Sequence, residues 1–301
     1  MSAASVLLQP GTLWPLVVCA THEALVAGAL QPIDTEQECI EDNGIRFLVR
    51  RLSSLARKAE ARVPEQTPGS GDPFLPYDPR LFVADVSRTH TVLLNKFPVL
   101  DHHLLIVTRA FEQQEALLSP ADFAALAFCM AEGAALAFYN GGRDAGASQD
   151  HKHLQLVPLP LAAGATELPI EPLLAHARSS SGVRTLSGLP LRHAYTDLAS
   201  EVWARPERTA EHLTRVYADL CHSAGIEERE LHGERRQSAP YNLLLTREWM
   251  LLVPRSREHY ASISVNALGF AGSLFVKDRA QLQRVRELGP MRVLQKVSMP
   301  A

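Results

Sequence analysis

One short segment, from Gly146 to Pro158, constrains this chain most, because it combines small residues with histidines and a glutamine at a regular spacing. It places His151, His153 and Gln155 at every second position, with Lys152 and Leu154 in between. Side chains at every second position of a β-strand point to the same face. A strand over residues 151–157 would therefore carry two imidazoles and an amide on one face. Such a polar face favours a functional site over a packed core.

Composition limits the partners that this chain of 301 residues can have. Hydrophobic residues make up 46% of it and charged residues 21%, which is typical of globular proteins with one large or two ordinary domains. The net charge of -3 provides no basic excess, so nucleic acid is not expected as a partner. The apolar run at residues 12–30 is interrupted by Pro15, His22 and Glu23, so a membrane span is not expected either.

The four cysteines are scattered along the chain. Cys19, Cys39, Cys129 and Cys221 form no Cys-x-x-Cys pair, so neither a zinc site nor a disulfide framework is indicated. Reduced thiols are typical of the cytosol, and we expect a cytoplasmic protein.

Hydrophobic runs and turn residues predict a mixed α+β fold. The predicted strands span residues 45–52, 81–86, 90–94, 104–107, 151–157, 241–246 and 250–253. The predicted helices begin at Thr12, span 119–139 and 208–223, and run from Asp278 to Leu288. Ser119 and Pro120 are favourable first residues for the second of these helices.

A weak internal repeat suggests two related halves. The strand–turn–strand pattern at residues 93–109 is similar to that at residues 244–255, although the second copy has no His-x-His. A segment rich in Pro, Ser, Gly and Ala at residues 158–190 separates the two copies. We therefore predict an N-terminal half over 1–165, which carries the histidines, and a C-terminal half over 166–301, which completes the site.

Three kinds of chemistry are open to the two histidines: metal binding, hydrogen bonding in a core, and nucleophilic attack. Gln155 is a poor zinc ligand, so no protein metal site is expected. The small residues from Gly146 to Ser148 allow backbone N–H groups to approach a phosphate. A histidine could then attack phosphorus while an amide, a hydroxyl and backbone N–H groups hold the phosphoryl oxygens. A lysine would balance the charge of the leaving polyphosphate.

The residues from Gly146 to Gln155 resemble the histidine-triad superfamily, in the branch that has glutamine in place of the third histidine. Within that branch the chain is similar to the family of ATP adenylyltransferases, also called diadenosine tetraphosphate phosphorylases. The similarity covers most of residues 45–278. Its further motifs are Leu94–Pro98, His103–Arg109, Tyr241–Thr246 and Asn266–Gly272.

The resemblance implies a role for each residue of the motif. His153 would be the nucleophile, His151 would support the site and contact phosphate, and Gln155 would stabilise the phosphoryl oxygens. Position 273 carries serine where some members of the family carry larger residues, which leaves the base preference open. The implied substrate-binding residues are Lys58, Asn95, Lys96, His103, Gly146, Ser148, Gln149, Lys152, Asn266, Ala267, Leu268, Ser273 and Lys277.

The same resemblance implies a fold and a reaction. The fold would be a HIT-like antiparallel sheet flanked by helices. The reaction would be phosphorolysis of diadenosine tetraphosphate to ATP and ADP through adenylyl-His153, and its reverse. The partners would be these small molecules and inorganic phosphate, without a resident cofactor, although a divalent cation such as Mg²⁺ can accompany the polyphosphate. The alternatives are a hexose-1-phosphate uridylyltransferase, which the unpaired cysteines disfavour, and a non-catalytic dinucleotide sensor.

Overall fold

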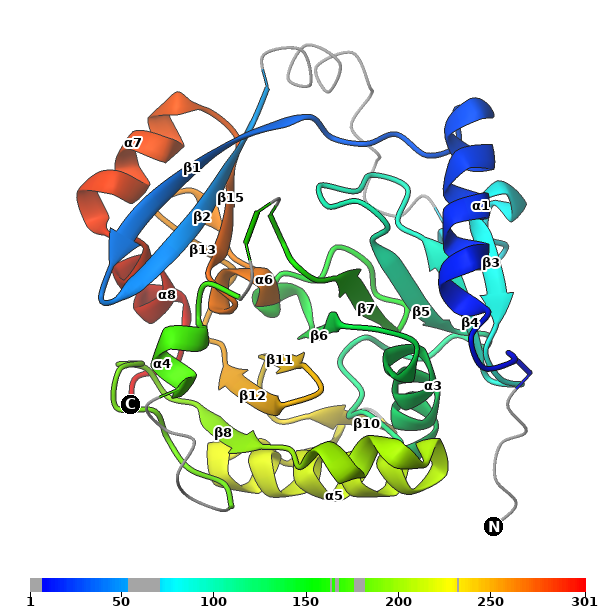
Figure 1. The fold of residues 1–301 in the computed structure, drawn as a ribbon. Coiled ribbons are helices and arrows are strands. Elements are labelled where there is room, and N and C mark those ends of the chain that lie inside the picture. Colours follow the sequence, from blue (N-terminus) through cyan, green and yellow to red (C-terminus); the bar gives the residue numbers. More distant parts are fainter. Residues whose placement is uncertain (1–6, 54–70, 163, 166–167, 176–181, 232) are drawn as a thin grey trace.

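An eight-stranded antiparallel sheet forms the middle layer of the molecule (Figure 1). The computed structural model describes residues 7–53, 71–162, 164–165, 168–175, 182–231 and 233–301. The strands of this sheet are β3 (Phe82–Asp85), β4 (His90–Leu94), β5 (Leu104–Thr108), β6 (Ala135–Gly141), β7 (His153–Pro158), β8 (Ala194–Asp197), β11 (Tyr241–Leu245) and β12 (Trp249–Pro254). Their order in space is β3-β4-β5-β7-β6-β11-β12-β8. The predicted α+β class with an antiparallel sheet is therefore confirmed.

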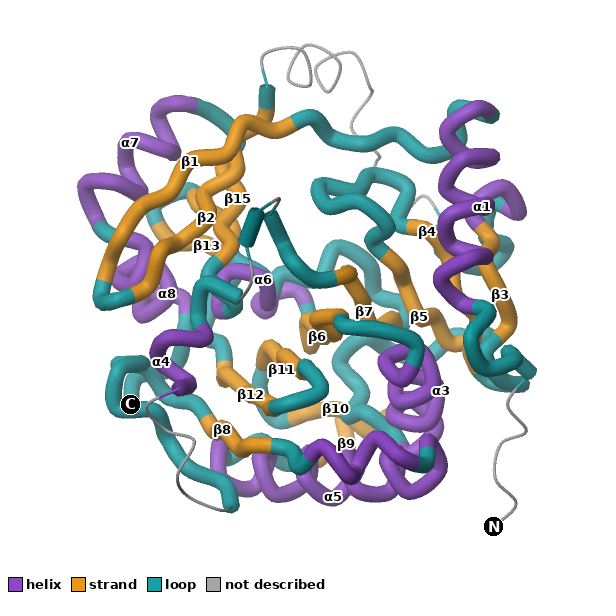
Figure 2. Tube along the Cα trace, viewed as in Figure 1, coloured by secondary structure: helices purple, strands orange, loops and turns teal. Residues whose placement is uncertain are grey.

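Three helices, α1 (Leu13–Val26), α3 (Pro120–Ala131) and α5 (Pro206–Ala224), pack against one face of this sheet (Figures 1 and 2). Leu154 and Leu156 of β7 point into the apolar core that these helices cover. The N-terminus of α3 has a capping box, in which Ser119 and Asp122 satisfy each other's backbone N–H groups.

The opposite face of the large sheet is covered in part by a three-stranded sheet of β1 (Thr35–Asp42), β2 (Ile45–Leu52) and β15 (Ser273–Val276). Helices α6 (Ala267–Phe270), α7 (Arg279–Leu288) and α8 (Pro290–Val297) pack beside it. The remaining elements are short: η1 (Pro79–Leu81), η2 (Arg143–Ala145), α4 (Glu171–Ala175), η3 (Ser200–Ala204), β9 (Glu228–Leu231), β10 (Glu234–Gln237), β13 (His259–Tyr260) and β14 (Ile263–Ser264).

The predicted helix over residues 119–139 is wrong in its second half. Helix α3 ends at Ala131, and the chain then turns and enters β6, every residue of which is buried. A continuous apolar run fits a buried strand and a buried helix equally well, because periodicity cannot distinguish them. The turn includes Gly133, where a Cβ atom would lie 2.8 Å from Trp14 Nε1.

The strand of the histidine motif begins two residues later than predicted, at His153. His151 forms only an isolated bridge with Gln113. The predicted alternation of faces is confirmed within β7, because Leu154 and Leu156 point into the helix-covered core and His153 and Gln155 point away from it. Strand β1 and helix α8 were not predicted.

Lys152 lies on the helix-covered side, which contradicts the expectation that it binds substrate. Its ammonium group is buried and lies 2.7 Å from Asp122 Oδ2, while Asp122 Oδ1 lies 2.9 Å from His90 Nε2. Burial alone would raise the pKa of Asp122, but the hydrogen bond from His90 and the charge of Lys152 hold that pKa well below its usual value. Lys152 therefore neutralises a buried carboxylate.

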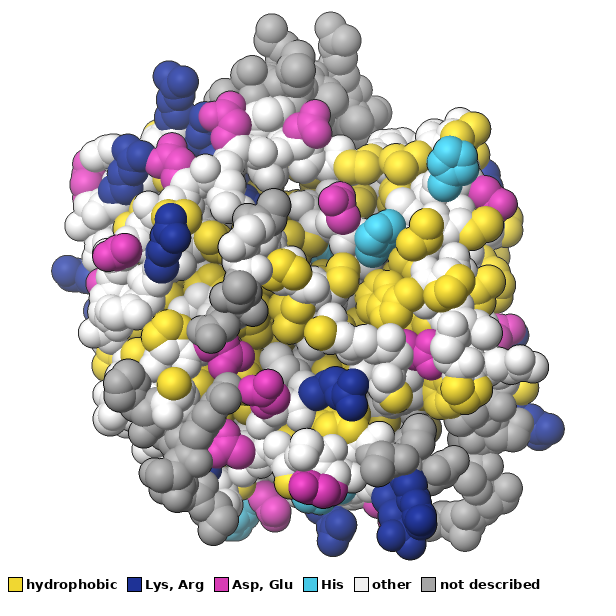
Figure 3. All heavy atoms as spheres, viewed as in Figure 1, with side chains coloured by type: hydrophobic (Ala, Val, Ile, Leu, Met, Phe, Trp, Pro, Cys, Tyr) yellow, Lys and Arg dark blue, Asp and Glu magenta, His cyan; other side chains and the backbone are white. Residues whose placement is uncertain are grey.

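Figure 3 shows hydrophobic side chains gathered in the hollowed centre of the face viewed in Figure 1, with charged side chains around its rim. No helix among the described residues has the length and apolar character needed to span a membrane.

Replacing Lys152 by methionine should lower the free energy of unfolding by about 3 kcal/mol or more, because it leaves the buried carboxylate of Asp122 without its cation. Chemical denaturation at neutral pH measures the change. The control is Arg286→Met, which removes an exposed pair with Glu38 and should cost less than about 1 kcal/mol. Equal losses in the two variants would contradict this account.

Candidate active site

A cavity of about 420 Å³ lies between the uncovered part of the large sheet and the β2–β15 edge of the smaller one. Its lining brings together residues from both ends of the chain. Eight of the predicted site residues line it: Asn95, His103, Gly146, Ser148, Gln155, Asn266, Leu268 and Ser273.

A chain of hydrogen bonds fixes the orientation of Gln155 at the cavity wall. The Asn95 amide NH2 donates to His103 Nδ1 at 3.2 Å, so His103 carries its proton on Nε2. That proton is donated to Gln155 Oε1 at 2.8 Å. The NH2 group of Gln155 is therefore left as the donor that can reach a ligand in the cavity.

His153 has the tautomer that a nucleophile requires. Its Nδ1–H donates to the carbonyl oxygen of His151 at 2.8 Å, so the lone pair lies on Nε2, which has no partner among the described residues. Burial lowers the pKa of both His153 and His103 to about 4. Both rings are therefore neutral at pH 7.

Both nitrogens of His151 are occupied by protein groups. Nδ1 lies 2.6 Å from Asp72 Oδ2, and Nε2 lies 2.9 Å from the Thr108 hydroxyl. The ring of Phe74 packs against the rings of His151 and His153, at centroid distances of 5.5 and 5.4 Å. In this structure the ring of His151 therefore has no free nitrogen for the predicted phosphate contact, and its supporting role stays a prediction.

The loop between β6 and β7 approaches the second half of the chain closely at Gly146. This glycine has φ +88, and a Cβ atom there would lie 2.8 Å from Asn266 Cβ and 2.9 Å from the carbonyl oxygen of Val265. Its N–H donates to the Arg143 carbonyl, so it is not free for the phosphate contact that we predicted. The N–H groups of Ser148 and Gln149 have no acceptor among the described residues and remain available.

A buried polar network under this loop sets the direction of Asn140. Arg255 donates to Asn242 Oδ1 at 2.5 Å, and Asn242 Nδ2 donates to Asn140 Oδ1 at 2.8 Å. The N–H of Ala267 also donates to Asn140 Oδ1, at 2.9 Å. Because Oδ1 of Asn140 is fully used, its NH2 group is left to face the cavity that Asn140 lines.

Several predicted residues lie outside the cavity lining, among them His151 and His153. Lys277 is exposed, Gln149 lines a separate cavity of about 300 Å³, and Lys96 lies with its ammonium 5.4 Å from the centre of the Phe97 ring. Ala267 is buried and contributes the backbone hydrogen bond to Asn140. Lys58 lies outside the described residues.

Asn140 and Arg50 are among the cavity residues that sequence reasoning missed. Asn140 directly follows the helix predicted over residues 119–139, although it belongs to β6. Arg50 lies on β2 and is only 6% exposed, and the run of residues 45–52 gave no sign that its side chain faces a cavity. The three arginines in this predicted strand were the one available signal, and they do not show which arginine is buried.

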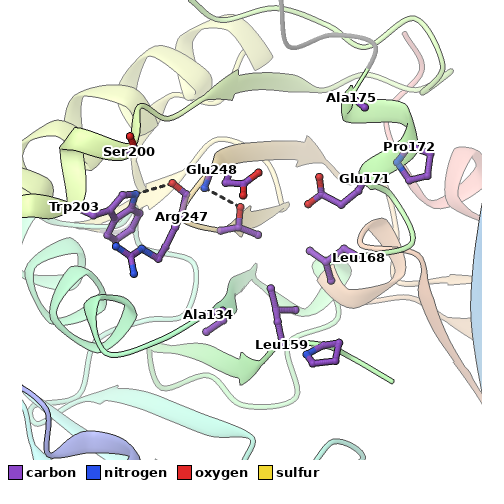
Figure 4. A pocket seen from close by; sticks show the side chains of 13 residues that line it. Ala134, Leu159, Leu168, Glu171, Pro172, Ala175, Ser200, Trp203, Arg247 and Glu248 are labelled. Carbon is purple, nitrogen blue, oxygen red and sulfur yellow. Dashed lines mark hydrogen bonds between the residues drawn. The ribbon is translucent and has the colours of Figure 1, made fainter. Parts of the chain in front are cut away.

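A second cavity among the described residues, of about 780 Å³, is larger than the one next to the histidines and lies apart from it (Figure 4). It includes Trp203, Arg247 and Glu248, and none of the predicted site residues lines it. The described residues also contain no group of three or more His, Cys, Asp or Glu side chains placed to hold a metal ion.

Comparison with known families assigns both parts of the chain. Residues 3–176 match the Ap4A phosphorylase N-terminal domain, and residues 187–300 match the ATP adenylyltransferase C-terminal domain. The chain belongs to the Ap4A phosphorylase family. The two matched segments are separated at residues 177–186, whereas we predicted the division after residue 165, and that boundary stays a prediction.

Individual members of the Ap4A phosphorylase family are similar over most of their length. Diadenosine 5',5'''-P1,P4-tetraphosphate phosphorylase 2 of Saccharomyces cerevisiae is 29% identical over 294 residues, covering 88% of this chain and 89% of that protein. Protein APA1 of the same organism is 27% identical, covering 92% and 91%. The crystal structure of yeast Apa2 in complex with Ap4A has the same fold, with a TM-score of 0.79 and 24% identity over 97% of this chain and 99% of that one.

The two buried neutral histidines make stability depend on pH. His103 and His153 have a pKa of about 4 in the folded protein, against about 6.5 in an unfolded chain. At a pH between these two pKa values, both histidines are protonated in the unfolded chain and neutral in the folded protein. The free energy of unfolding should therefore fall as the pH is lowered from about 6.5 to 4, by at most about 1.4 kcal/mol per pH unit for each histidine.

Urea unfolding across this pH range measures that slope. A His153→Gln variant should show a shallower slope than the unmodified protein, because one of the two groups is gone. An unchanged slope would mean that His153 does not titrate as described.

Proposed function

We propose that this chain cleaves diadenosine tetraphosphate with inorganic phosphate to give ATP and ADP, through a covalent adenylyl group on His153. The membership in the Ap4A phosphorylase family makes it a nucleotidyltransferase. One observation carries the mechanism: the buried, neutral His153 has its Nδ1–H fixed by the His151 carbonyl and its Nε2 free, next to Gln155. That is the state in which an imidazole can attack phosphorus.

The reaction has two displacements. His153 Nε2 forms a bond to the α-phosphorus, the bond from that phosphorus to the bridging oxygen breaks, and ATP leaves. An oxygen of inorganic phosphate then attacks the same phosphorus. The N–P bond breaks, its electron pair returns to His153 Nε2, and ADP is released.

Amide donors at the cavity wall would hold the phosphoryl oxygens in both steps. They are the NH2 groups of Gln155 and Asn140, which the hydrogen-bond chains behind them leave facing the ligand. The free N–H groups of Ser148 and Gln149 lie on the neighbouring loop. A divalent cation such as Mg²⁺ would come with the polyphosphate as part of the substrate.

The family matches favour this reaction over the hexose-1-phosphate uridylyltransferase that we considered, and over a non-catalytic sensor. The cytoplasmic location stays a prediction.

Chromatography of the products with and without phosphate tests the proposal. Diadenosine tetraphosphate should give ATP and ADP only when phosphate is present. A His153→Ala variant should lose about 10³-fold or more in turnover, because the covalent route is lost. Release of AMP and ATP without any need for phosphate would mean that water is the acceptor, and would contradict phosphorolysis.

His193 supplies a matched control for the loss of a buried histidine. Its Nδ1 makes the same local contact, 2.7 Å from the carbonyl oxygen two residues earlier, but its Nε2 accepts the Leu186 N–H at 2.7 Å and so cannot attack a substrate. A His193→Gln variant should therefore keep its turnover at temperatures where it remains folded. A loss as large as that of His153→Ala would show that the effect is on folding.

A further inference from the structure

Arg50 is a buried cation on the cavity wall that lacks a counter-charge. Its guanidinium donates to the Ser273 hydroxyl at 2.5 Å and to the Leu161 carbonyl oxygen, and no carboxylate among the described residues pairs with it. A guanidinium has five N–H donors, so three of them have no acceptor among those residues. Because Arg50 lines the cavity, a ligand there can accept hydrogen bonds from these remaining donors.

Two other buried arginines differ from Arg50 in that neither of them lines the cavity, although the Nε of Arg51 is also buried without a hydrogen-bond partner. Arg51, the next residue on β2, points to the other face of its sheet and pairs with Glu36. Arg255 places its five donors near five oxygens, of which four are main-chain carbonyls. The free donors of Arg50 therefore differ from that of Arg51 because they belong to a residue that lines the cavity.

The position of Arg50 indicates which part of the substrate it meets. Strand β7 starts at His153 and runs away from the phosphate loop, and Leu161, which Arg50 contacts, follows its far end. In the pairing of β2 with β15, Arg50 lies opposite Phe275. The apolar side chains of the cavity, which suit a nucleobase, are Ile33, Phe97, Val99, Leu100, Leu268, Leu274 and Phe275. The phosphate groups belong at the opposite end, beside Ser148 and Gln155.

The donors left on Arg50 match one purine better than the other. The edge of guanine presents two acceptors, O6 and N7, which pair with the planar fork of an arginine. The same edge of adenine presents one acceptor, N7, and one donor, its amino group. The Ser273 hydroxyl could accept a hydrogen bond from that amino group, but Arg50 could not, because a guanidinium only donates. We propose that Arg50 reads the base of the transferred nucleotide and favours guanine over adenine there. This inference rests on the proposed nucleotidyl transfer to His153.

A mixed substrate, with adenosine at one end of the tetraphosphate and guanosine at the other, reports the choice directly. Phosphorolysis gives GDP and ATP when the guanosine end is transferred, and ADP and GTP when the adenosine end is transferred. The unmodified enzyme should favour GDP and ATP by about 5- to 150-fold. Because both products come from the same enzyme molecules, a partial loss of folded protein does not alter the ratio.

Arg50→Met should move that ratio to about one or below, and Arg50→Lys should lower it as well, because lysine keeps the charge but not the fork. Arg51→Met, from the same strand, is the matched control and should leave the ratio unchanged. A ratio near one in the unmodified enzyme, or a ratio that Arg50→Met does not change, would overturn the inference. Slower turnover of Arg50→Met at an unchanged ratio would also overturn it and would assign Arg50 to the phosphates.

Failure of this inference can be told apart from failure of the proposed function. If the unmodified enzyme converts diadenosine tetraphosphate with phosphate into ATP and ADP, the proposed function holds whatever the mixed substrate gives. If it does not, the reaction itself is wrong and the base ratio has no meaning.

Discussion

The site depends on one buried polar chain, from Arg255 through Asn242 to Asn140. Burial lowers the pKa of Arg255 to about 9, yet the guanidinium keeps oxygen partners for its donors, so its charge is compensated without a carboxylate in contact. This chain of hydrogen bonds holds β6, β11 and the loop after β12 in one arrangement. Because Asn140 also accepts from Ala267, the same chain fixes α6 against the strand that leads to the phosphate loop. Loss of the hydrogen bonds of Arg255 would therefore also disturb groups that Arg255 does not contact.

The same principle governs the other wall of the cavity. Asn95 and His103 use up the oxygen of Gln155, just as Asn242 and Ala267 use up the oxygen of Asn140. In both cases an amide is forced to present its NH2 group to the ligand. Donors that are oriented before the substrate arrives need no reorganisation when negative charge develops on phosphorus. The buried hydrogen bonds of the site thus fix the direction of a few side chains.

What the sequence could predict was local. The alternation around His153 and Gln155 indicated the polar face correctly, and the cap at Ser119 indicated a helix start that the structure confirms. Asn140 was misplaced because an apolar run has no period that separates helix from buried strand. Lys152 was misplaced because its partner, Asp122, is recognisable only once α3 packs against the sheet. Contacts of this kind join residues far apart in sequence, and no local pattern encodes them.

Arg50 shows that limit most clearly, and it also bears on how the two parts of the chain are related. Its hydroxyl partner Ser273 is separated from it by 223 positions in the sequence, and the two meet only because β15 pairs in parallel with β2. Gly146 and Asn266 meet in the same way, at a separation that a side chain on the glycine would not permit. The parts matched by the two family domains therefore each supply part of the wall of one cavity. A change in the second part, such as at position 273, can alter which ligand the first part accepts, because the orientation of Arg50 depends on it.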